Sequence, residues 1–175
     1  MSIKTIFLDR DGVINKEINY LNNIEDFEFI NGVFEACKYF ESLNYKIIII
    51  TNQSGILREF LTEKDFQTIT KWMVNQFNKN DIHILDVFHC PHLQSHNCNC
   101  RKPKPGMLNE AKKKYNINMQ DSWMIGDKES DIKAANSAEI SNTILVRSGH
   151  KIDETRSNAK FFIDSIKYSQ KIITS

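Results

Sequence analysis

The sequence predicts an α/β fold in which one doubly wound, Rossmann-like parallel sheet carries helices on both faces. Short apolar runs recur along the chain, and each run is continuous rather than alternating, which is typical of strands buried on both faces of a sheet. Apolar residues at helical spacing lie between these runs. The chain has 175 residues, enough for one core and few for two, so we expect residues 1–175 to form a single domain without a large cap domain.

The apolar runs predict six strands, over residues 3–8, 46–50, 84–88, 122–125, 143–146 and 160–163. Three segments between them have one apolar face at helical spacing: Val33, Ala36, Cys37 and Phe40; Phe66, Ile69, Met73 and Phe77; Leu108, Ala111 and Tyr115. Thr62 with Asp65 predicts a capping box for the second helix, and Pro105 suits the first turn of the third. Residues 151–175 are expected to add a final strand and a helix that close the sheet.

The charge balance argues against two classes of partner. The chain carries 23 basic and 22 acidic side chains, a formal net charge of +1, so no global field favours nucleic acid or a membrane surface. No apolar run approaches the roughly 20 residues that span a bilayer, and the N-terminus lacks the basic start and apolar stretch of a signal peptide. We therefore expect a cytoplasmic protein that binds neither nucleic acid nor membrane. We also expect a monomer.

Three of the four cysteines lie within eleven residues of one another, with a histidine between them. Cys90, His92, Cys98 and Cys100 have the short spacings that are typical of a tetrahedral zinc site. Three cysteines and one histidine fill the coordination of zinc and leave no open position for chemistry, so we expect a structural Zn²⁺ that staples this loop. Cys37 lies on an apolar helical face and is interpreted as a buried hydrophobic residue rather than a nucleophile.

Polar and charged residues follow the predicted strands. Asp9, Thr51 and Asp127 each come shortly after an apolar run, and so does the segment 89–102. The carboxyl ends of parallel strands meet at one edge of a sheet, where ligands bind in doubly wound folds. We expect these residues to converge on one site.

Four segments carry a resemblance to a known family. They are Asp9-Arg10-Asp11-Gly12-Val13-Ile14-Asn15, Thr51-Asn52-Gln53-Ser54-Gly55, Arg101-Lys102-Pro103, and Gly126-Asp127-Lys128 with Asp131. In this order they resemble the motifs of the phosphatases of the haloacid dehalogenase superfamily, over the stretch from Phe7 to Asp131. The resemblance implies a phosphoric monoester hydrolase.

The resemblance also implies a role for each acidic residue. Asp9 would attack phosphorus and form an aspartyl-phosphate, and Asp11 would protonate the leaving alkoxide and then activate water. Asp9, Asp127 and the backbone carbonyl of Asp11 would hold Mg²⁺, because a phosphate between carboxylates needs a hard cation. Asp131, one helical turn after Asp127, would support that metal shell.

The remaining candidate residues would bind phosphate or substrate. Thr51 would donate its hydroxyl to a phosphoryl oxygen, together with the backbone amides of Asn52 and Asp11. Lys102 would neutralise the nucleophile and the phosphoryl group from a loop held by the cysteines. The planar fork of Arg101 suits a second phosphate or a carboxylate, which points to a doubly charged substrate. The other expected substrate contacts are Asn52, Gln53, Ser54, Arg58 and Lys128.

Two branches of the superfamily resemble the chain in its cysteine-histidine loop, the heptose bisphosphate phosphatases and the histidinol phosphatases. The string Pro105-Gly106-Met107 and the pair Ser54-Gly55 favour the first branch. That branch removes the C7 phosphate of D-glycero-D-manno-heptose 1,7-bisphosphate, and the product would serve ADP- or GDP-heptose and lipopolysaccharide or other surface glycan synthesis. The five-residue gap between His92 and Cys98 matches the second branch instead, and Leu57-Arg58-Glu59 stands where the first branch commonly has Ala-Arg-Gly. We expect a small phosphorylated sugar as substrate and keep histidinol phosphate as the alternative.

Two other interpretations remain open. A zinc-binding interaction module without catalysis could contact RNA through Arg101, Lys102 and Lys104, but this basic cluster is short and no aromatic residues interleave with it. A polynucleotide 3′-phosphatase shares the first motif, but its zinc loop would be unexplained.

Overall fold

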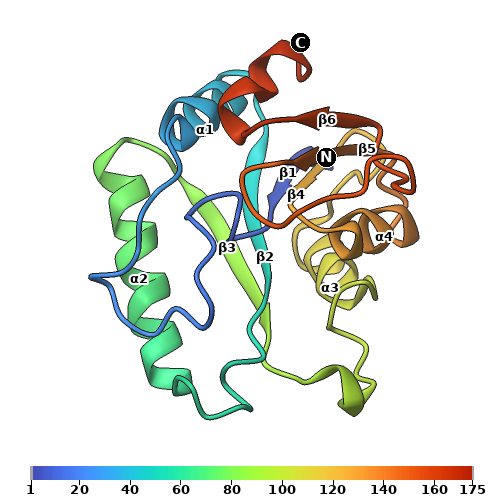
Figure 1. Cartoon of the computed structure of the whole chain (residues 1–175). Helices are drawn as coiled ribbons and strands as arrows, with labels where there is room; N and C mark the ends of the chain where they lie inside the picture. The colour runs from blue at the N-terminus through green and yellow to red at the C-terminus, as the bar shows by residue number, and fades with distance from the viewer. Residues whose placement is uncertain (1, 175) are drawn as a thin grey trace.

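The computed structural model describes residues 2–174; Met1 and Ser175, which the predicted domain includes, lie outside the described residues. Within the described residues, six strands form one parallel sheet in the order β3-β2-β1-β4-β5-β6 (Figure 1). The strands are β1 (Thr5–Leu8), β2 (Lys46–Asn52), β3 (Ile84–Cys90), β4 (Trp123–Gly126), β5 (Asn142–Val146) and β6 (Phe161–Ile163). The predicted doubly wound parallel sheet is confirmed.

Helices cover both faces of the sheet (Figure 1). One face packs against α1 (Val33–Ser42), α2 (Glu63–Lys79) and the 3-10 helix η2 (Ile166–Lys171). The other face packs against α3 (Gly106–Tyr115) and α4 (Glu129–Ser137). A short 3-10 helix, η1 (Gln94–His96), lies in the loop after β3.

The central strands are buried on both faces, which explains their continuous apolar runs. In β1, Ile6 and Leu8 belong to the core beneath α1 and α2, whereas Phe7 belongs to the core beneath α3 and α4. The four consecutive isoleucines of β2 alternate between the two cores in the same way. Cys37 is buried in the first core, as expected of a small hydrophobic residue, and burial raises the pKa of its thiol.

Three strands that lead to the site end later than the sequence predicts: β4 by one residue, at Gly126, and β2 and β3 by two. β2 continues to Asn52 and β3 continues to Cys90, with Thr51 paired to His89. The apolar run ends at the first polar side chain, but the ladder uses backbone N–H and C=O groups and continues past it. Near the other end of the chain, the helix predicted after the last strand is the short 3-10 helix η2.

The strand order reverses beside β1. From β1 the chain proceeds outward to β2 and β3, and it then crosses to β4 on the other side of β1. Doubly wound sheets bind ligands at such a reversal, outside the carboxyl ends of the strands. Asp9 follows β1 and Asp127 follows β4, so both residues lie at the reversal.

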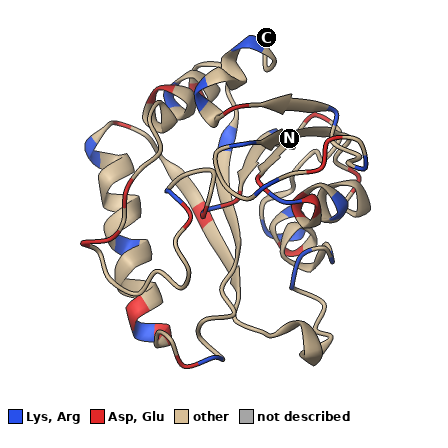
Figure 2. Ribbon diagram, in the orientation of Figure 1, with Lys and Arg blue, Asp and Glu red and all other residues tan. Residues whose placement is uncertain are grey.

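Charged side chains of both signs are interspersed along the helices (Figure 2), in keeping with the net charge of +1. Among residues 2–174, no helix has both the length and the apolar character that a membrane crossing requires.

Thr62 begins α2 with the predicted capping box. Its hydroxyl accepts a hydrogen bond from the Asp65 amide at 3.1 Å, and the Asp65 carboxylate accepts one from the Thr62 amide at 2.9 Å. We expect Thr62→Ala to lower the free energy of unfolding by about 1 kcal/mol, because a first-turn amide loses its acceptor. Urea denaturation followed by circular dichroism measures this change. Thr68→Ala is the matched control, since Thr68 lies within the same helix and its hydroxyl donates to the Lys64 carbonyl; equal losses in both variants would contradict the capping argument.

Candidate active site

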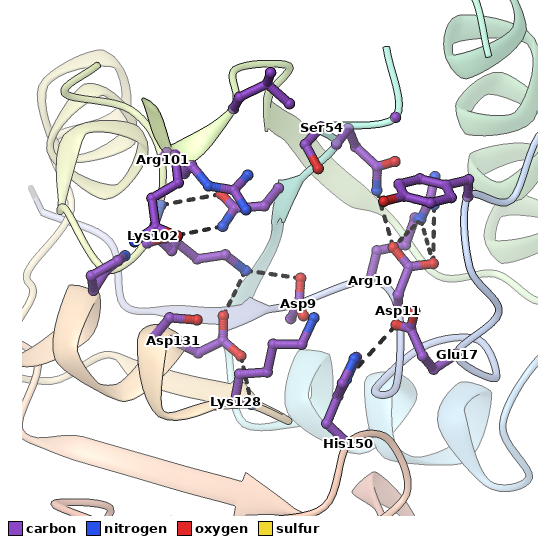
Figure 3. A pocket seen from close by; sticks show the side chains of 18 of the residues that line it. Asp9, Arg10, Asp11, Glu17, Ser54, Arg101, Lys102, Lys128, Asp131 and His150 are labelled. Carbon is purple, nitrogen blue, oxygen red and sulfur yellow. Dashed lines mark hydrogen bonds and ion pairs between the residues drawn. The ribbon is translucent and has the colours of Figure 1, made fainter. Parts of the chain in front are cut away.

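A cavity of about 740 Å³ opens at the carboxyl ends of the strands. The segments that follow the strands β1 to β5 all contribute to its lining. The lining residues are 9–11 and 17–21 after β1; 52–55 at the end of β2; 93, 94, 97, 98 and 101–104 after β3; 128, 130 and 131 after β4; and 150 after β5. Figure 3 shows Arg101 and Lys102 on one side of this cavity and Asp11 and Glu17 on the opposite side, with Asp9 between them. The structure therefore brings the strand-end residues together, as their positions along the chain predict.

Lys102 lies at the centre of the site. Its ammonium group is 2.8 Å from Asp9 Oδ1 and 2.7 Å from Asp131 Oδ1, and it donates a hydrogen bond to the Ile50 carbonyl at 2.7 Å. Burial alone would lower the pKa of Lys102, but the charges of Asp131 and Asp9 outweigh burial and raise it. The side chain is therefore a permanent cation beside Asp9.

Three buried carboxylates, those of Asp9, Asp127 and Asp131, each place one oxygen within 4.8 Å of the others. Burial raises the pKa of Asp9 well above its usual value, Lys102 opposes this rise, and the charges of Asp131 and Asp127 add to it. Asp127 is fully buried, and its Oδ1 has no hydrogen-bond partner among the described residues. Hard divalent cations bind such carboxylate oxygens, so the cluster fits Mg²⁺.

Asp131 fixes the position of Asp127. Its Oδ2 accepts hydrogen bonds from the backbone amides of Asp127 at 3.1 Å and Lys128 at 3.0 Å. Gly126 leaves room for this arrangement, because a Cβ at that position would lie 2.3 Å from the Cβ of Asp131. Asp131 thus stands behind Asp127 on the first turn of α4, where the sequence places a supporting carboxylate.

Asp11 turns toward Arg10, a residue to which the sequence analysis gives no role. The Arg10 guanidinium donates to the Asp11 carboxylate from Nη2 at 3.0 Å and from Nε at 3.2 Å, and Asn15 and Gln53 each donate at 3.0 Å. Burial opposes ionisation of Asp11, but the charge of Arg10 and these hydrogen bonds outweigh it and lower the pKa. Asp11 is therefore an ionised carboxylate on the wall of the cavity.

The end of β2 is tied to both neighbouring loops. Asn52 donates to the Lys102 carbonyl at 3.1 Å and accepts from the Lys102 amide at 3.1 Å. Gln53 bridges Asp11 and Thr51, since its Nε2 also donates to the Thr51 hydroxyl at 2.8 Å. Thr51 itself is buried beneath the lining, at the end of the strand.

The predicted substrate contacts fall into two groups. Most of them line the cavity: Asn52, Gln53, Ser54, Arg101 and Lys128. Arg58 is exposed and is absent from the described lining. Contact between Arg58 and the substrate stays a prediction.

The predicted zinc ligands also come together. Cys90, His92, Cys98 and Cys100 place their Sγ and Nδ1 atoms within 4.8 Å of one another, and the three sulfur atoms are 3.0, 3.4 and 3.6 Å apart. Burial opposes ionisation of Cys98, but hydrogen bonds from the Arg101 amide and the neighbouring thiols lower its pKa to about 6. Zinc binds thiolates at about 2.3 Å in a tetrahedron, so this cluster fits Zn²⁺.

His150, which follows β5, is a further residue of the site that the sequence did not predict. Its Nδ1 lies 2.6 Å from Asp127 Oδ2, and its backbone amide donates to the same oxygen at 3.0 Å. Gly149 permits this approach, because a Cβ there would lie 2.1 Å from Asp127 Oδ2. Glu17 completes a second cluster with Asp127 and His150, and burial raises the pKa of Glu17. The position of His150 could have identified it, because Ser148-Gly149-His150 follow a predicted strand and so lie at the same edge of the sheet as the other strand ends.

Known proteins resemble the chain in sequence and in fold. A family model described as "HAD-hyrolase-like" matches residues 99–168. The chain is 48% identical over 164 residues to a D-glycero-alpha-D-manno-heptose-1,7-bisphosphate 7-phosphatase of Photorhabdus laumondii, covering 90% of each protein. It is 41% identical over 175 residues to a D-glycero-beta-D-manno-heptose-1,7-bisphosphate 7-phosphatase of Vibrio cholerae, covering 95% of this chain and 94% of the relative. The crystal structure of a D,D-heptose 1,7-bisphosphate phosphatase from B. bronchiseptica, complexed with magnesium and phosphate, matches in fold with a TM-score of 0.83 at 24% identity, over 94% of each chain.

A parallel sheet that gathers Asp9, Lys102 and Asp127 at its reversal point defines a phosphatase of the haloacid dehalogenase class, a phosphoric monoester hydrolase. This class excludes a zinc-binding module without catalysis. With 48% identity over nearly the full length of a curated relative, the chain belongs to the family of heptose-1,7-bisphosphate 7-phosphatases.

The cysteine cluster leads to a prediction about metal content. We expect the purified protein to contain one zinc ion per chain and Cys98→Ser to lose it, because the variant removes a thiolate ligand. Elemental analysis by mass spectrometry measures the metal. Cys37→Ala is the matched control, since Cys37 is buried elsewhere in the core and should leave the zinc content unchanged. Full zinc content in Cys98→Ser would contradict the assignment.

The raised pKa of Asp9 leads to a prediction about stability and pH. Between pH 3.8, the ordinary pKa of an aspartate, and the raised pKa of Asp9 in the folded protein, folded Asp9 keeps its proton. In the same pH range the unfolded chain has lost that proton. Unfolding then releases a proton, so the contribution of Asp9 to stability falls as pH rises through this window. In the absence of divalent metal, the wild type should therefore lose stability relative to Asp9→Asn as pH rises from about 4 toward neutrality. The measured quantity is the free energy of unfolding of the variant minus that of the wild type, and it should grow.

Urea titrations of both proteins in chelating buffer at several pH values measure this difference. Mg²⁺ added at neutral pH is the control and should stabilise the wild type, because a bound cation offsets the charge of the carboxylates. A difference that stays constant or shrinks with rising pH would contradict the predicted sign.

Proposed function

We propose that this chain hydrolyses the C7 phosphate of D-glycero-D-manno-heptose 1,7-bisphosphate and leaves heptose 1-phosphate. The proposal rests on the contact of Lys102 with Asp9, 2.8 Å long, in a cavity whose lining also holds Arg101 and Lys128. Asp9 and Lys102 suit a reacting phosphate, and Arg101 and Lys128 suit a second phosphate. The names of relatives that match over about nine tenths of their length support the same substrate.

Asp9 is the proposed nucleophile. Lys102 holds its Oδ1, and the carboxylate attacks phosphorus in line with the C7 oxygen. The bond between phosphorus and that oxygen breaks as the bond to Asp9 forms, which gives an aspartyl-phosphate. Lys102 lowers the repulsion between the carboxylate and the phosphate, and its raised pKa keeps it charged at neutral pH.

Asp11 is the proposed acid and base. Its pKa is lowered in the free protein, but an arriving phosphate dianion raises the pKa of a nearby carboxylate and favours uptake of a proton. Asp11 passes this proton to the leaving C7 alkoxide and then takes one from the water that hydrolyses the aspartyl-phosphate. Asp11 is then protonated as it was when the substrate bound, and it releases this proton to solvent when the product phosphate leaves, which restores the ionised carboxylate of the free protein.

Asp9, Asp127 and the backbone carbonyl of Asp11 are the proposed ligands of Mg²⁺, with Asp131 behind Asp127. When bound, the ion neutralises phosphoryl charge and orients the phosphate. Thr51 is a proposed donor to a phosphoryl oxygen, together with the backbone amides of Asn52 and Asp11. The Thr51 hydroxyl accepts from Gln53, which leaves its own proton free for this bond.

Arg101 and Lys128 are proposed to bind the second phosphate, and Asn52, Gln53 and Ser54 to contact the sugar. The zinc cluster is proposed to be structural, holding the loop that carries Arg101. We further propose that the chain folds as one domain and acts as a cytoplasmic monomer. Its product would enter heptose-nucleotide synthesis for surface glycans.

Histidinol phosphate is the competing substrate, favoured by the five-residue gap between His92 and Cys98. The test is kcat/KM for both anomers of heptose 1,7-bisphosphate and for histidinol phosphate, with magnesium and zinc-loaded protein. We expect at least about a hundredfold preference for the bisphosphate, because histidinol phosphate leaves the cations for the second phosphate unpaired.

Asp9→Asn is the control without a nucleophile and should lose at least about a thousandfold in kcat. A preference for histidinol phosphate would overturn the proposed substrate, and a fully active Asp9→Asn protein would overturn the proposed mechanism.

A further inference from the structure

The carboxylate of Asp127 is held through one of its two oxygens and is free at the other. Its Oδ2 accepts a hydrogen bond from the backbone amide of His150 at 3.0 Å and lies 2.6 Å from Nδ1 of the same residue. Its Oδ1 is buried and has no hydrogen-bond partner among the described residues. Two nitrogen atoms of one residue therefore occupy Oδ2 and leave Oδ1 for another ligand.

The ring of His150 pairs with Asp127 rather than with Glu17. Glu17 is the other carboxylate that the ring faces (Figure 3), but its Oε2 lies 4.0 Å from Nδ1, beyond hydrogen-bond distance. An ionised carboxylate only accepts hydrogen bonds, so the contact with Asp127 places a proton on Nδ1. The ring is thus a donor to Asp127, and a donor to a charged acceptor makes one of the stronger hydrogen bonds in proteins.

The loop that carries His150 is anchored on both sides of the ring. Before it, the Ser148 hydroxyl donates to the Gly12 carbonyl at 2.7 Å, which ties the loop to the segment after β1. Across the loop, Arg147 Nε donates to the Glu154 carboxylate at 2.6 Å. The His150 side chain is 38% exposed, so these anchors and its own hydrogen bond hold it, not packing in the core.

A carboxylate that binds a cation needs a fixed orientation, because the terminal torsion of an aspartate is soft. Groups that hydrogen-bond a metal ligand from behind provide this orientation, and loss of one typically weakens metal binding by roughly 10- to 100-fold. Asp131 supports Asp127 only through its backbone amide, whereas His150 contacts the carboxylate itself. Among these two supports, His150 is the one that can select which oxygen faces a cation.

We propose that His150 is a positioning residue for the divalent cation: it holds Oδ2 of Asp127, so that Oδ1 is the oxygen presented to the ion. This inference rests on the proposed function, in which Asp127 is a ligand of Mg²⁺. His150 acts through Asp127 and sets the affinity for the ion. It does not set the rate of the chemical steps once the ion is bound.

The test measures cation binding in the absence of substrate, with zinc-loaded protein. Mn²⁺ is the probe, because it takes the same oxygen ligands as Mg²⁺ and its free form is quantified by electron paramagnetic resonance. His150→Ala removes the ring donor and keeps the backbone amide, and we expect it to raise the Kd for Mn²⁺ about tenfold. His150→Asn keeps a nitrogen donor bonded to Cγ, as Nδ1 is, and its Kd should stay within about threefold of the wild type.

Two reference variants and one kinetic readout complete the experiment. Asp127→Asn removes a charged ligand and should weaken Mn²⁺ binding at least about a hundredfold. His83→Ala is the matched control, since His83 is an exposed histidine outside the described cavity lining, and it should leave the Kd unchanged. With heptose 1,7-bisphosphate, His150→Ala should need about tenfold more Mg²⁺ for half-maximal rate, while kcat at saturating Mg²⁺ stays within about twofold of the wild type.

The outcomes separate this inference from the proposed function. Equal Mn²⁺ affinity in the wild type and His150→Ala would overturn the role of His150 and leave the proposed metal ligation standing. Equal losses in His150→Ala and His150→Asn, or a large drop in the melting temperature of both in chelating buffer, would show that the donor on Nδ1 is not the cause. A low kcat of His150→Ala at saturating Mg²⁺ would place His150 in the chemical steps and would also overturn the inference. Equal Mn²⁺ affinity in the wild type and Asp127→Asn would overturn the proposed ligation itself, and the role of His150 with it.

Discussion

The burial of the Lys102 ammonium is the constraint on which the rest of the site depends. A buried charge is costly unless it is paired and hydrogen-bonded, and Lys102 is held by Asp9, Asp131 and the Ile50 carbonyl. Asp9 follows β1, Asp131 lies in the first turn of α4 and Ile50 lies near the end of β2, so one side chain from the loop after β3 ties together three separate parts of the sheet edge. Figure 3 shows the contacts of Lys102 with Asp9 and Asp131. Asn52 repeats this tie through the backbone of Lys102.

The same arrangement leaves negative charge in excess around Asp127. Lys102 is one cation against three clustered carboxylates; burial is the main cause of the raised pKa of Asp9, and the charges of Asp131 and Asp127 add to it. Gly12 and Gly149 crowd Asp127 from two loops, since a Cβ at either position would lie 2.4 or 2.1 Å from its Oδ2. Such a site gives up stability, because clustered buried carboxylates repel one another and the cluster fits a hard cation that would offset their charge.

Sequence patterns predicted the parts of this structure that depend on local order. Continuous apolar runs located the six strands, because burial on both faces affects every residue of a strand. They did not locate α4 as a separate helix, since Ala134 and Ala135 pack it against the sheet and small residues give a weak apolar pattern. Strand ends predicted which segments meet at the site, but not how their side chains pair. The turn of Asp11 toward Arg10 and the contact of His150 with Asp127 depend on distances between segments, which spacing along the chain does not encode.

Arg101 and Lys102 are adjacent in sequence but differ in what holds them. The Arg101 guanidinium donates to the His92 carbonyl at 3.1 Å and stays in the cavity lining, whereas the Lys102 side chain is buried beside Asp9. A compact ammonium suits the buried position, where its pairing is fixed, and a planar guanidinium suits the open position, where it can exchange a backbone carbonyl for an anion. Because Cys100 immediately precedes this pair, the cysteine cluster sets the backbone from which both cations extend. It therefore helps to fix where both cations lie at the cavity, and a shift of one residue in this loop would exchange the buried cation for the open one.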